Sequence, residues 1–179
     1  MSDTCEAKPA AVERTNPILS VFKSALRGMA SSVCVITTCD DAGKPHGMAA
    51  SAVASVSFDP PSMLIAVNES ASISGRLKAT KAFCINVLTC DHDHVVESFS
   101  NSAMRERRFE SDEWGYGPLG LPYLRTAQAS IFCQEDGALA YGTHTVFIGR
   151  VFDVLIGDKN SPFVWHNGTR VQIQSVAQF

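Results

Sequence analysis

The chain has 179 residues, of which 45% are hydrophobic and 18% are charged, and 15 Lys and Arg against 18 Asp and Glu give a formal net charge of −3. This composition excludes a largely disordered chain. The slightly acidic balance argues against a protein that binds nucleic acid or anionic membranes through bulk positive charge. A length below about 200 residues is typical of one domain. We therefore divide the chain into a tail, residues 1–15, and one domain, residues 16–179.

The N-terminus and the cysteines bear on the compartment. Residues 1–13 are polar and begin with acidic residues, which is not the pattern of a signal peptide. The longest large-apolar run, residues 63–67, is far shorter than the ~20 residues that cross a bilayer. The even number of cysteines allows a disulfide framework, but Cys34, Cys84 and Cys133 lie in apolar, strand-like runs where free thiols are usual. The sequence predicts a cytoplasmic protein with reduced thiols and no membrane or nucleic-acid partner.

In the first half of the chain, one helix precedes a series of short strands. Asn16-Pro17 is typical of a helix start, and apolar residues from Ile18 to Met29 recur at helical spacing. A second, short helix is predicted over residues 71–80. Runs of β-branched, small or continuous apolar residues predict strands over residues 33–38, 46–58, 62–68 and 82–88.

The second half of the chain is predicted to begin with helices and to end with strands. Helices are expected over residues 91–100 and 103–108, and a Gly-rich loop over 109–122. Strands are expected over residues 127–134, 143–156, 162–165 and 169–173, the last two joined by an Asn-Gly turn. About seven strands that do not alternate with helices favour a mainly β, antiparallel barrel over a doubly wound sheet.

Two motifs are typical of cofactor or metal sites but lack the context that such sites need. Residues 115–120 match G-x-G-x-x-G, yet acidic residues precede them and Pro118 and Pro122 block a following helix, so a surface loop is predicted. His92 and His94 are two residues apart on a predicted helix and would face different directions, so no metal site is predicted.

A more specific signal runs from residue 46 to residue 61. This stretch, HGMAASAVASVSFDPP, resembles the Gly-Met-Thr-Ala-Ser … Ser-Val-Ser-x-Asp-Pro-Pro signature of the short-chain flavin reductase family, which includes the reductase components of two-component flavin monooxygenases. The resemblance spans residues 22–171. Further matches follow in the family's order at residues 35–38, Asn68 with Ser70 and Ser72, 83–88, Phe99, 107–109 with Trp114, 142–145 and 165–166.

The resemblance implies a split β-barrel of Greek-key-like topology that forms a homodimer and holds a flavin near the subunit interface. The isoalloxazine ring would be lined by Met48, Ala49, Ala50, Ser51 and Ala52. The flavin phosphate would be met by Asn68, Ser70 and Ser72, and other parts of the cofactor site would be formed by Thr37, Ser57, Phe83, Asn86 and Phe99. The residue placed beside the nicotinamide, and thus the candidate catalytic residue, is His144. The chain departs from the family at Ala50, where Thr or Ser is usual, and at Glu69, where a neutral or basic residue is commoner.

The implied activity is hydride transfer from NADH or NADPH to FMN or FAD, with the reduced flavin supplied to a partner monooxygenase. Such chemistry is carried by the cofactors, so the protein needs no metal and no nucleophile of its own. Two alternatives remain open from the residues. One is a reductase that keeps its flavin and reduces a corrinoid, ferric iron or a quinone. The other is a flavin- or haem-binding module without turnover.

Overall fold

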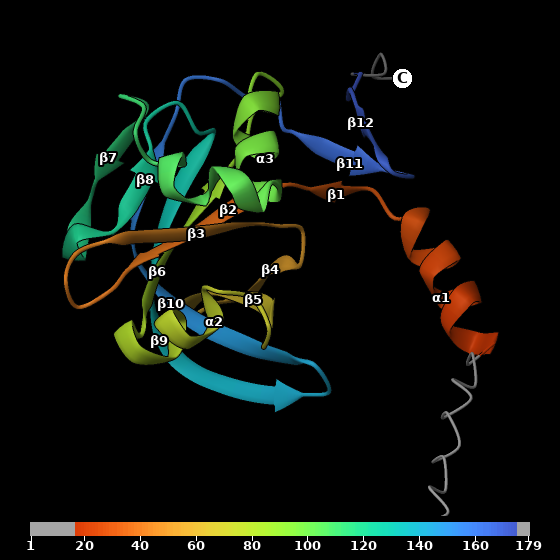
Figure 1. The fold of residues 1–179 in the computed structure, drawn as a ribbon, viewed down its shortest axis with the longest axis horizontal. Helices are drawn as coiled ribbons and strands as arrows, with labels where there is room; N and C mark the ends of the chain where they lie inside the picture. Colours follow the sequence, from red (N-terminus) through yellow and green to blue (C-terminus); the bar gives the residue numbers. More distant parts are fainter. Residues whose placement is uncertain (1–16, 175–179) are drawn as a thin grey trace, which may run out of the picture.

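The computed structural model describes residues 17–174, so the predicted tail and the predicted helix cap at Asn16 lie outside the described residues. Its centre is a seven-stranded, wholly antiparallel sheet in the order β3-β2-β6-β9-β10-β5-β4 (Figure 1). The mainly β, antiparallel prediction is therefore confirmed. The strands are β2 (Cys34–Cys39), β3 (Pro45–Ala50), β4 (Val53–Phe58), β5 (Pro61–Asn68), β6 (Ala82–Val87), β9 (Ala129–Tyr141) and β10 (His144–Ile156).

The connection between β3 and β4 curls this sheet into a barrel. These two strands are the opposite edges of the sheet, yet only residues 51–52 separate them in the chain. The edges must therefore meet at this corner, where Ala52 O accepts a hydrogen bond from Ala66 N of β5 (3.0 Å). The prediction of a single strand over residues 46–58 is therefore wrong. Closure of the barrel divides this stretch into two strands at residues 51–52.

Two smaller sheets lie outside the barrel. One pairs β1 (Ser31–Ser32) with β11 (Val164–His166) and β12 (Thr169–Val171). Asn167 and Gly168 both have positive φ at the β11–β12 turn, as the predicted Asn-Gly hairpin requires. The other sheet pairs β7 (Trp114–Tyr116) with β8 (Pro122–Leu124), so the segment predicted as a Gly-rich loop contains strand pairing as well.

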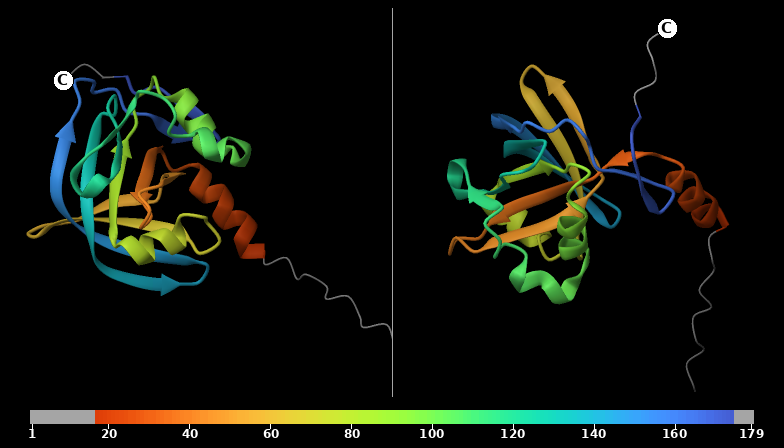
Figure 2. Two further views of the ribbon diagram at one scale, coloured as in Figure 1. Left: turned by 60° about the vertical axis from the view of Figure 1, so that its left-hand side comes forward. Right: turned by 90° about the horizontal axis from the view of Figure 1, so that it is seen from above.

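The helices are short. They are α1 (Pro17–Arg27), α2 (Ser74–Thr80), α3 (Asp93–Ser100) and the 3₁₀ turns η1 (Ser102–Arg107) and η2 (Pro118–Gly120). Helix α2 begins three residues later than predicted, after the turn formed by residues 68–73. Figure 2 shows α1 standing away from the barrel, beyond the β1–β11–β12 sheet. No helix within residues 17–174 is long and apolar enough to cross a membrane.

Two apolar clusters fix the barrel and the elements around it. Ile36, Ile65, Phe83 and Phe147 belong to the cluster inside the barrel, which α2 closes with Leu77. The second cluster packs α3 and the β7–β8 sheet onto the outer side of β2, through residues that include Val35, Leu88, Val95, Phe99, Trp114 and Leu124. Strand β3 lies between these two clusters, so both hold it in place.

Candidate active site

Strand β3 is an edge strand whose Gly47 is closely overlaid by two aromatic rings. Its hydrogen-bonded neighbour in the sheet is β2, and edge strands leave backbone N–H and C=O groups open to a ligand. Gly47 is buried, and an ideal Cβ at this position would stand 2.5 Å from Cε1 of Phe99. A glycine is required here because the rings of Phe99 and Phe109 press on the backbone.

The five predicted ring contacts share this strand and the corner after it. Met48 and Ala50 pack against the cluster inside the barrel, and Ala49 packs against the outer cluster. Ser51 and Ala52 are exposed at the corner. The side chains of Met48, Ala49 and Ala50 thus pack against the two clusters. What remains available to a flat ring is the backbone N–H and C=O groups of β3 and the exposed corner at residues 51–52.

The predicted phosphate segment folds into a turn that brings Ser72 beside β3. Asn68 Oδ1 accepts hydrogen bonds from the backbone N–H (2.9 Å) and the hydroxyl (2.7 Å) of Ser70. The Asn68 and Ser70 side chains therefore form the turn itself. Ser72 is exposed and shares a small cavity of about 50 Å³ with Gly47. The structure thus brings together two predicted parts of the site that are 25 residues apart in the sequence.

Four basic side chains that the sequence-based site did not include line the same small cavity: Lys44, His46, Arg105 and Arg108. His46 lies 3.0 Å from a carboxylate oxygen of Asp40, and this hydrogen bond is the main reason that the pKa of Asp40 is lowered. Glu106 lines the cavity as well and pairs with Lys44 (2.8 Å), so the basic groups and the Ser72 hydroxyl that suit a phosphate stand beside one carboxylate. The match of residues 107–109 to the family pattern was the one signal in the sequence that pointed here.

Glu69, the acidic departure from the family, is neutralised by its surroundings. Its carboxylate accepts hydrogen bonds from Lys78 Nζ at 2.7 and 2.9 Å and from the Thr145 hydroxyl. The bond from Lys78, followed by the bond from Thr145, lowers the pKa of Glu69. The negative charge is therefore directed toward α2 and β10, and an ammonium group stands beside it.

His144 lies at the start of β10, next to the phosphate segment. In the sheet register its backbone stands opposite Asn68 of β5 on one side and Tyr141 of β9 on the other. The side chain is exposed, and its Nδ1 is 2.9 Å from the hydroxyl of Thr143. The imidazole is thus held by a neighbour and remains accessible to a ligand.

Four predicted cofactor contacts are buried beneath the surface: Thr37, Phe83, Asn86 and Phe99. Asn86 donates to Val35 O (3.0 Å) and accepts from Leu124 N (2.8 Å) and from Ser130 Oγ (3.0 Å), so its amide ties β6 to β2, β8 and β9 on the outer face of the sheet. Thr37 donates to Pro122 O in the same region. All four side chains are buried, and the hydrogen bonds of Thr37 and Asn86 join neighbouring strands.

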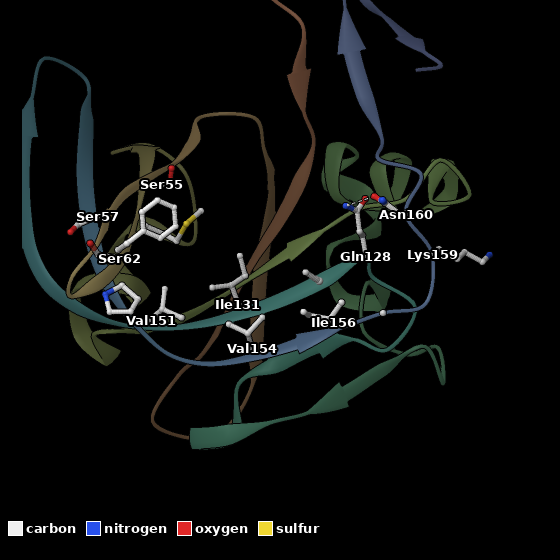
Figure 3. A pocket seen from close by; sticks show the side chains of 15 residues that line it. Ser55, Ser57, Ser62, Gln128, Ile131, Val151, Val154, Ile156, Lys159 and Asn160 are labelled. Atoms are coloured by element: carbon white, nitrogen blue, oxygen red, sulfur yellow. Dashed lines mark hydrogen bonds between the residues drawn. The ribbon is translucent and has the colours of Figure 1, made fainter. Parts of the chain in front are cut away.

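Ser57 is separated from the other predicted contacts. Its hydroxyl accepts from Asp59 N (3.0 Å) and donates to Asp59 O (2.9 Å), closing the β4–β5 turn. It lines a larger cavity of about 520 Å³, at the opposite end of which lie Gln128 and Asn160 (Figure 3). Within residues 17–174, this cavity shares no lining residue with the one that contains Ser72.

Comparison with known proteins places the chain in a family. Residues 26–174 match the flavin reductase like domain. The reductase component of the FADH(2)-dependent resorcinol hydroxylase of Rhizobium sp. (strain MTP-10005) is 37% identical over 147 residues, 82% of each chain. The NADH-dependent FMN reductase RutF of Agrobacterium fabrum is 33% identical over 146 residues, which cover 82% of this chain and 83% of that protein.

Solved structures agree with this assignment. BorF, the flavin reductase component of a bacterial two-component tryptophan halogenase, superimposes with a TM-score of 0.80 at 28% identity, covering 88% of this chain and 99% of that one. The NADH:FAD oxidoreductase SgcE6 of Streptomyces globisporus, in complex with NAD and FAD fragments, gives 0.82 at 25% identity over 93% of this chain and 99% of that one. With its barrel, its small-residue edge strand and this likeness over most of its length, the chain belongs to the flavin reductase-like domain family.

Proposed function

We propose that this protein, an NAD(P)H-dependent flavin reductase, takes flavin as a substrate and passes the reduced flavin to a separate monooxygenase. The observation that supports the proposal is the cavity in which Ser72 lies beside Gly47, among four basic side chains and one carboxylate, Glu106. It provides a phosphate-binding group next to an open strand edge. A flavin mononucleotide needs both, one for its phosphate and one for its ring.

The residues present fit a flavin at this site. The close approach of Phe99 and Phe109 to Gly47 fixes the position of β3, and the small side chains of residues 49–51 would leave its edge accessible. When bound, the flavin would accept a hydride from the nicotinamide, and backbone N–H groups along residues 48–51 would stabilise the negative charge that develops on the flavin ring.

His144 would orient the second substrate. Its exposed imidazole lies on the strand next to Asn68, at the side of the phosphate segment. A hydrogen bond from this ring to the carboxamide or a phosphate of the dinucleotide would align the hydride donor without any proton transfer by the protein. This role fits a site in which the protein supplies binding and alignment and the two substrates supply the reacting atoms.

The test is to mix the purified protein with NADH or NADPH, with and without added FMN or FAD, and to follow absorbance at the nicotinamide band. Oxidation that requires added flavin is the expected result. In a second outcome, the protein retains its flavin through purification and oxidises NADH or NADPH only when ferric iron, a corrinoid or a quinone is added. That result would contradict flavin as a substrate. No oxidation with any of these would contradict the activity itself and favour a binding module.

We also propose that the protein is a homodimer. Helix α1 presents Val21, Phe22 and Leu26 to solvent, each about half exposed or more. A helix of this length is marginal in water unless its apolar face is buried. On the barrel, Phe58 and Ile156 are 93% and 83% exposed beside the larger cavity, which adds a second apolar surface for a partner.

Light scattering on the full chain tests the homodimer. The wild-type protein should have twice the mass of the chain, and Phe22→Asp on the apolar stripe should shift the mass toward the monomer. Lys23→Asp, on the same helix but off the stripe, is the matched control and should leave the mass unchanged. A monomeric wild-type protein would contradict the proposal.

A further inference from the structure

Arg108 joins three parts of the chain that meet at strand β3. Its guanidinium donates to the carbonyl oxygens of Ser98 (2.9 Å), Phe99 (3.1 Å) and Asn101 (3.0 Å), where α3 ends and η1 begins. A further hydrogen bond reaches Gly47 O in β3 (3.3 Å). One side chain therefore ties the end of a helix to an edge strand. Gly47 lies 61 residues before Arg108 in the sequence.

The surroundings hold this guanidinium in place. Its central carbon lies 5.1 Å from the centre of the Phe99 ring, within the range of a cation–π contact. Partial burial, followed by the charge of Arg105, lowers the pKa of Arg108. Phe99 in turn presses on Gly47, so the ring and the guanidinium contact the same residue of β3, one through packing and one through its carbonyl.

Arg108 also borders the small cavity that contains Ser72. The carbonyl it holds belongs to the residue just before Met48, where the predicted ring-binding stretch begins. Because β3 has its sheet partner on one side alone, a shift of Gly47 would move the open edge that the flavin is expected to contact. Arg107, the adjacent residue, instead extends to Glu110 (3.1 Å) and is largely exposed.

We propose that Arg108 is a positioning residue for flavin binding: by bridging the end of α3 to Gly47 O, it holds the edge of β3 in the arrangement that receives the ring. This inference rests on the proposed function. It requires the fork of the guanidinium rather than positive charge, since an ammonium group cannot reach four carbonyls spread over two elements.

The first measurement needs no ligand. In hydrogen exchange of the full chain without flavin, Arg108→Met should speed exchange in peptides covering residues 45–50, whereas peptides from β9 and β10 should keep the wild-type rate. Arg107→Met is the matched control and should match the wild type throughout. Unchanged exchange in residues 45–50 of Arg108→Met would overturn the positioning role, whether or not the protein reduces flavin.

The second measurement is kinetic. Arg108→Met should raise the KM for flavin by about tenfold, because the edge of β3 is no longer held in the arrangement that receives the ring, while the KM for NADH and kcat at saturating flavin stay near the wild type. Arg108→Lys should resemble Arg108→Met. Full recovery of the flavin KM by Lys would overturn the proposal in favour of a charge effect. If Arg108→Met instead lowers the melting temperature, lowers kcat and raises the KM values for both flavin and NADH, the residue has a general structural role and the proposal is overturned.

Discussion

The Cε1 atom of Phe99 occupies the place where a side chain on Gly47 would begin, 2.5 Å from the ideal Cβ position. We predict that Gly47→Ala destabilises the protein by about 1–3 kcal/mol through overpacking and weakens flavin binding, because β3 must move outward. Chemical denaturation and a flavin fluorescence titration measure the two effects. Gly137→Ala in β9, where a Cβ would meet nothing within 4 Å, should leave both near the wild type.

A second substitution checks the cause of the Gly47 effect. Phe99→Leu removes ring atoms next to residue 47 and should recover part of the stability lost in Gly47→Ala when the two changes are combined. If the double variant instead loses the sum of the two single effects, the contact between Phe99 and Gly47 is not the source of the destabilisation.

For His144, an exposed residue, we predict an effect on the dinucleotide rather than on folding. His144→Ala should raise the KM for NAD(P)H by about three- to tenfold, since one hydrogen bond is lost, and should leave flavin affinity and the melting temperature nearly unchanged. Steady-state kinetics with each substrate varied in turn measure this. A variant whose stability falls while its KM for NAD(P)H stays the same would contradict the role.

The pairing of Glu69 with Lys78 predicts a charge effect on flavin binding. Lys78→Met leaves the Glu69 carboxylate without its ammonium partner near the phosphate segment, so flavin affinity should fall by about two- to fivefold and the loss should shrink as salt is added. The double variant Glu69→Gln, Lys78→Met should bind like the wild type. A deficit in the double variant equal to that of Lys78→Met alone would show that the lysine contacts the flavin itself.

The lowered pKa of Asp40 predicts a pH-dependent contribution to stability. Its carboxylate accepts hydrogen bonds from Ala42 N (3.0 Å) and Lys44 N (2.9 Å) in the β2–β3 turn and lies beside His46. Because folding lowers this pKa from its ordinary value of 3.8, the carboxylate stabilises the protein fully above that value and loses its effect as the pH falls through the folded pKa. The difference in melting temperature between the wild type and Asp40→Asn should therefore be constant near neutral pH and shrink in acid. Asp41→Asn, at an exposed neighbour, serves as control.

The buried cysteines should be slow to react. Burial raises the pKa of Cys34 and of Cys133 to about 12 and raises that of Cys84 as well, so little thiolate is present near neutral pH. Alkylation of the native protein at pH 8 should label Cys90 before these three. After denaturation without reductant, all six thiols of the chain should react. Missing thiols would contradict both the reduced state and the prediction of a cytoplasmic protein.

Much of the fold followed from local patterns. The apolar run before Asn68 and the alternation that begins near Ala129 predict strands that the structure contains. A strand buried on one face alternates apolar and polar residues, and a strand buried on both faces is apolar throughout, so either pattern is visible in the sequence. The Asn167-Gly168 turn was predictable for a similar reason, since few residues adopt positive φ at low cost. The order of motifs along the chain was enough to identify the flavin reductase family.

The arrangement of the site depended on contacts between distant residues. Local sequence predicts one strand across residues 51–52, and closure of the barrel between its edge strands breaks it. Ser72 shares a cavity with Gly47, and Arg108 reaches the Gly47 carbonyl, because the turn before α2 and the segment after α3 both approach β3. Thr37 and Asn86, predicted as cofactor contacts, are buried because β8 covers them: Thr37 donates to Pro122 O and Asn86 accepts from Leu124 N. A family motif marks positions that matter, whereas sheet register and helix packing decide which of them face the cavity and which hold it in shape.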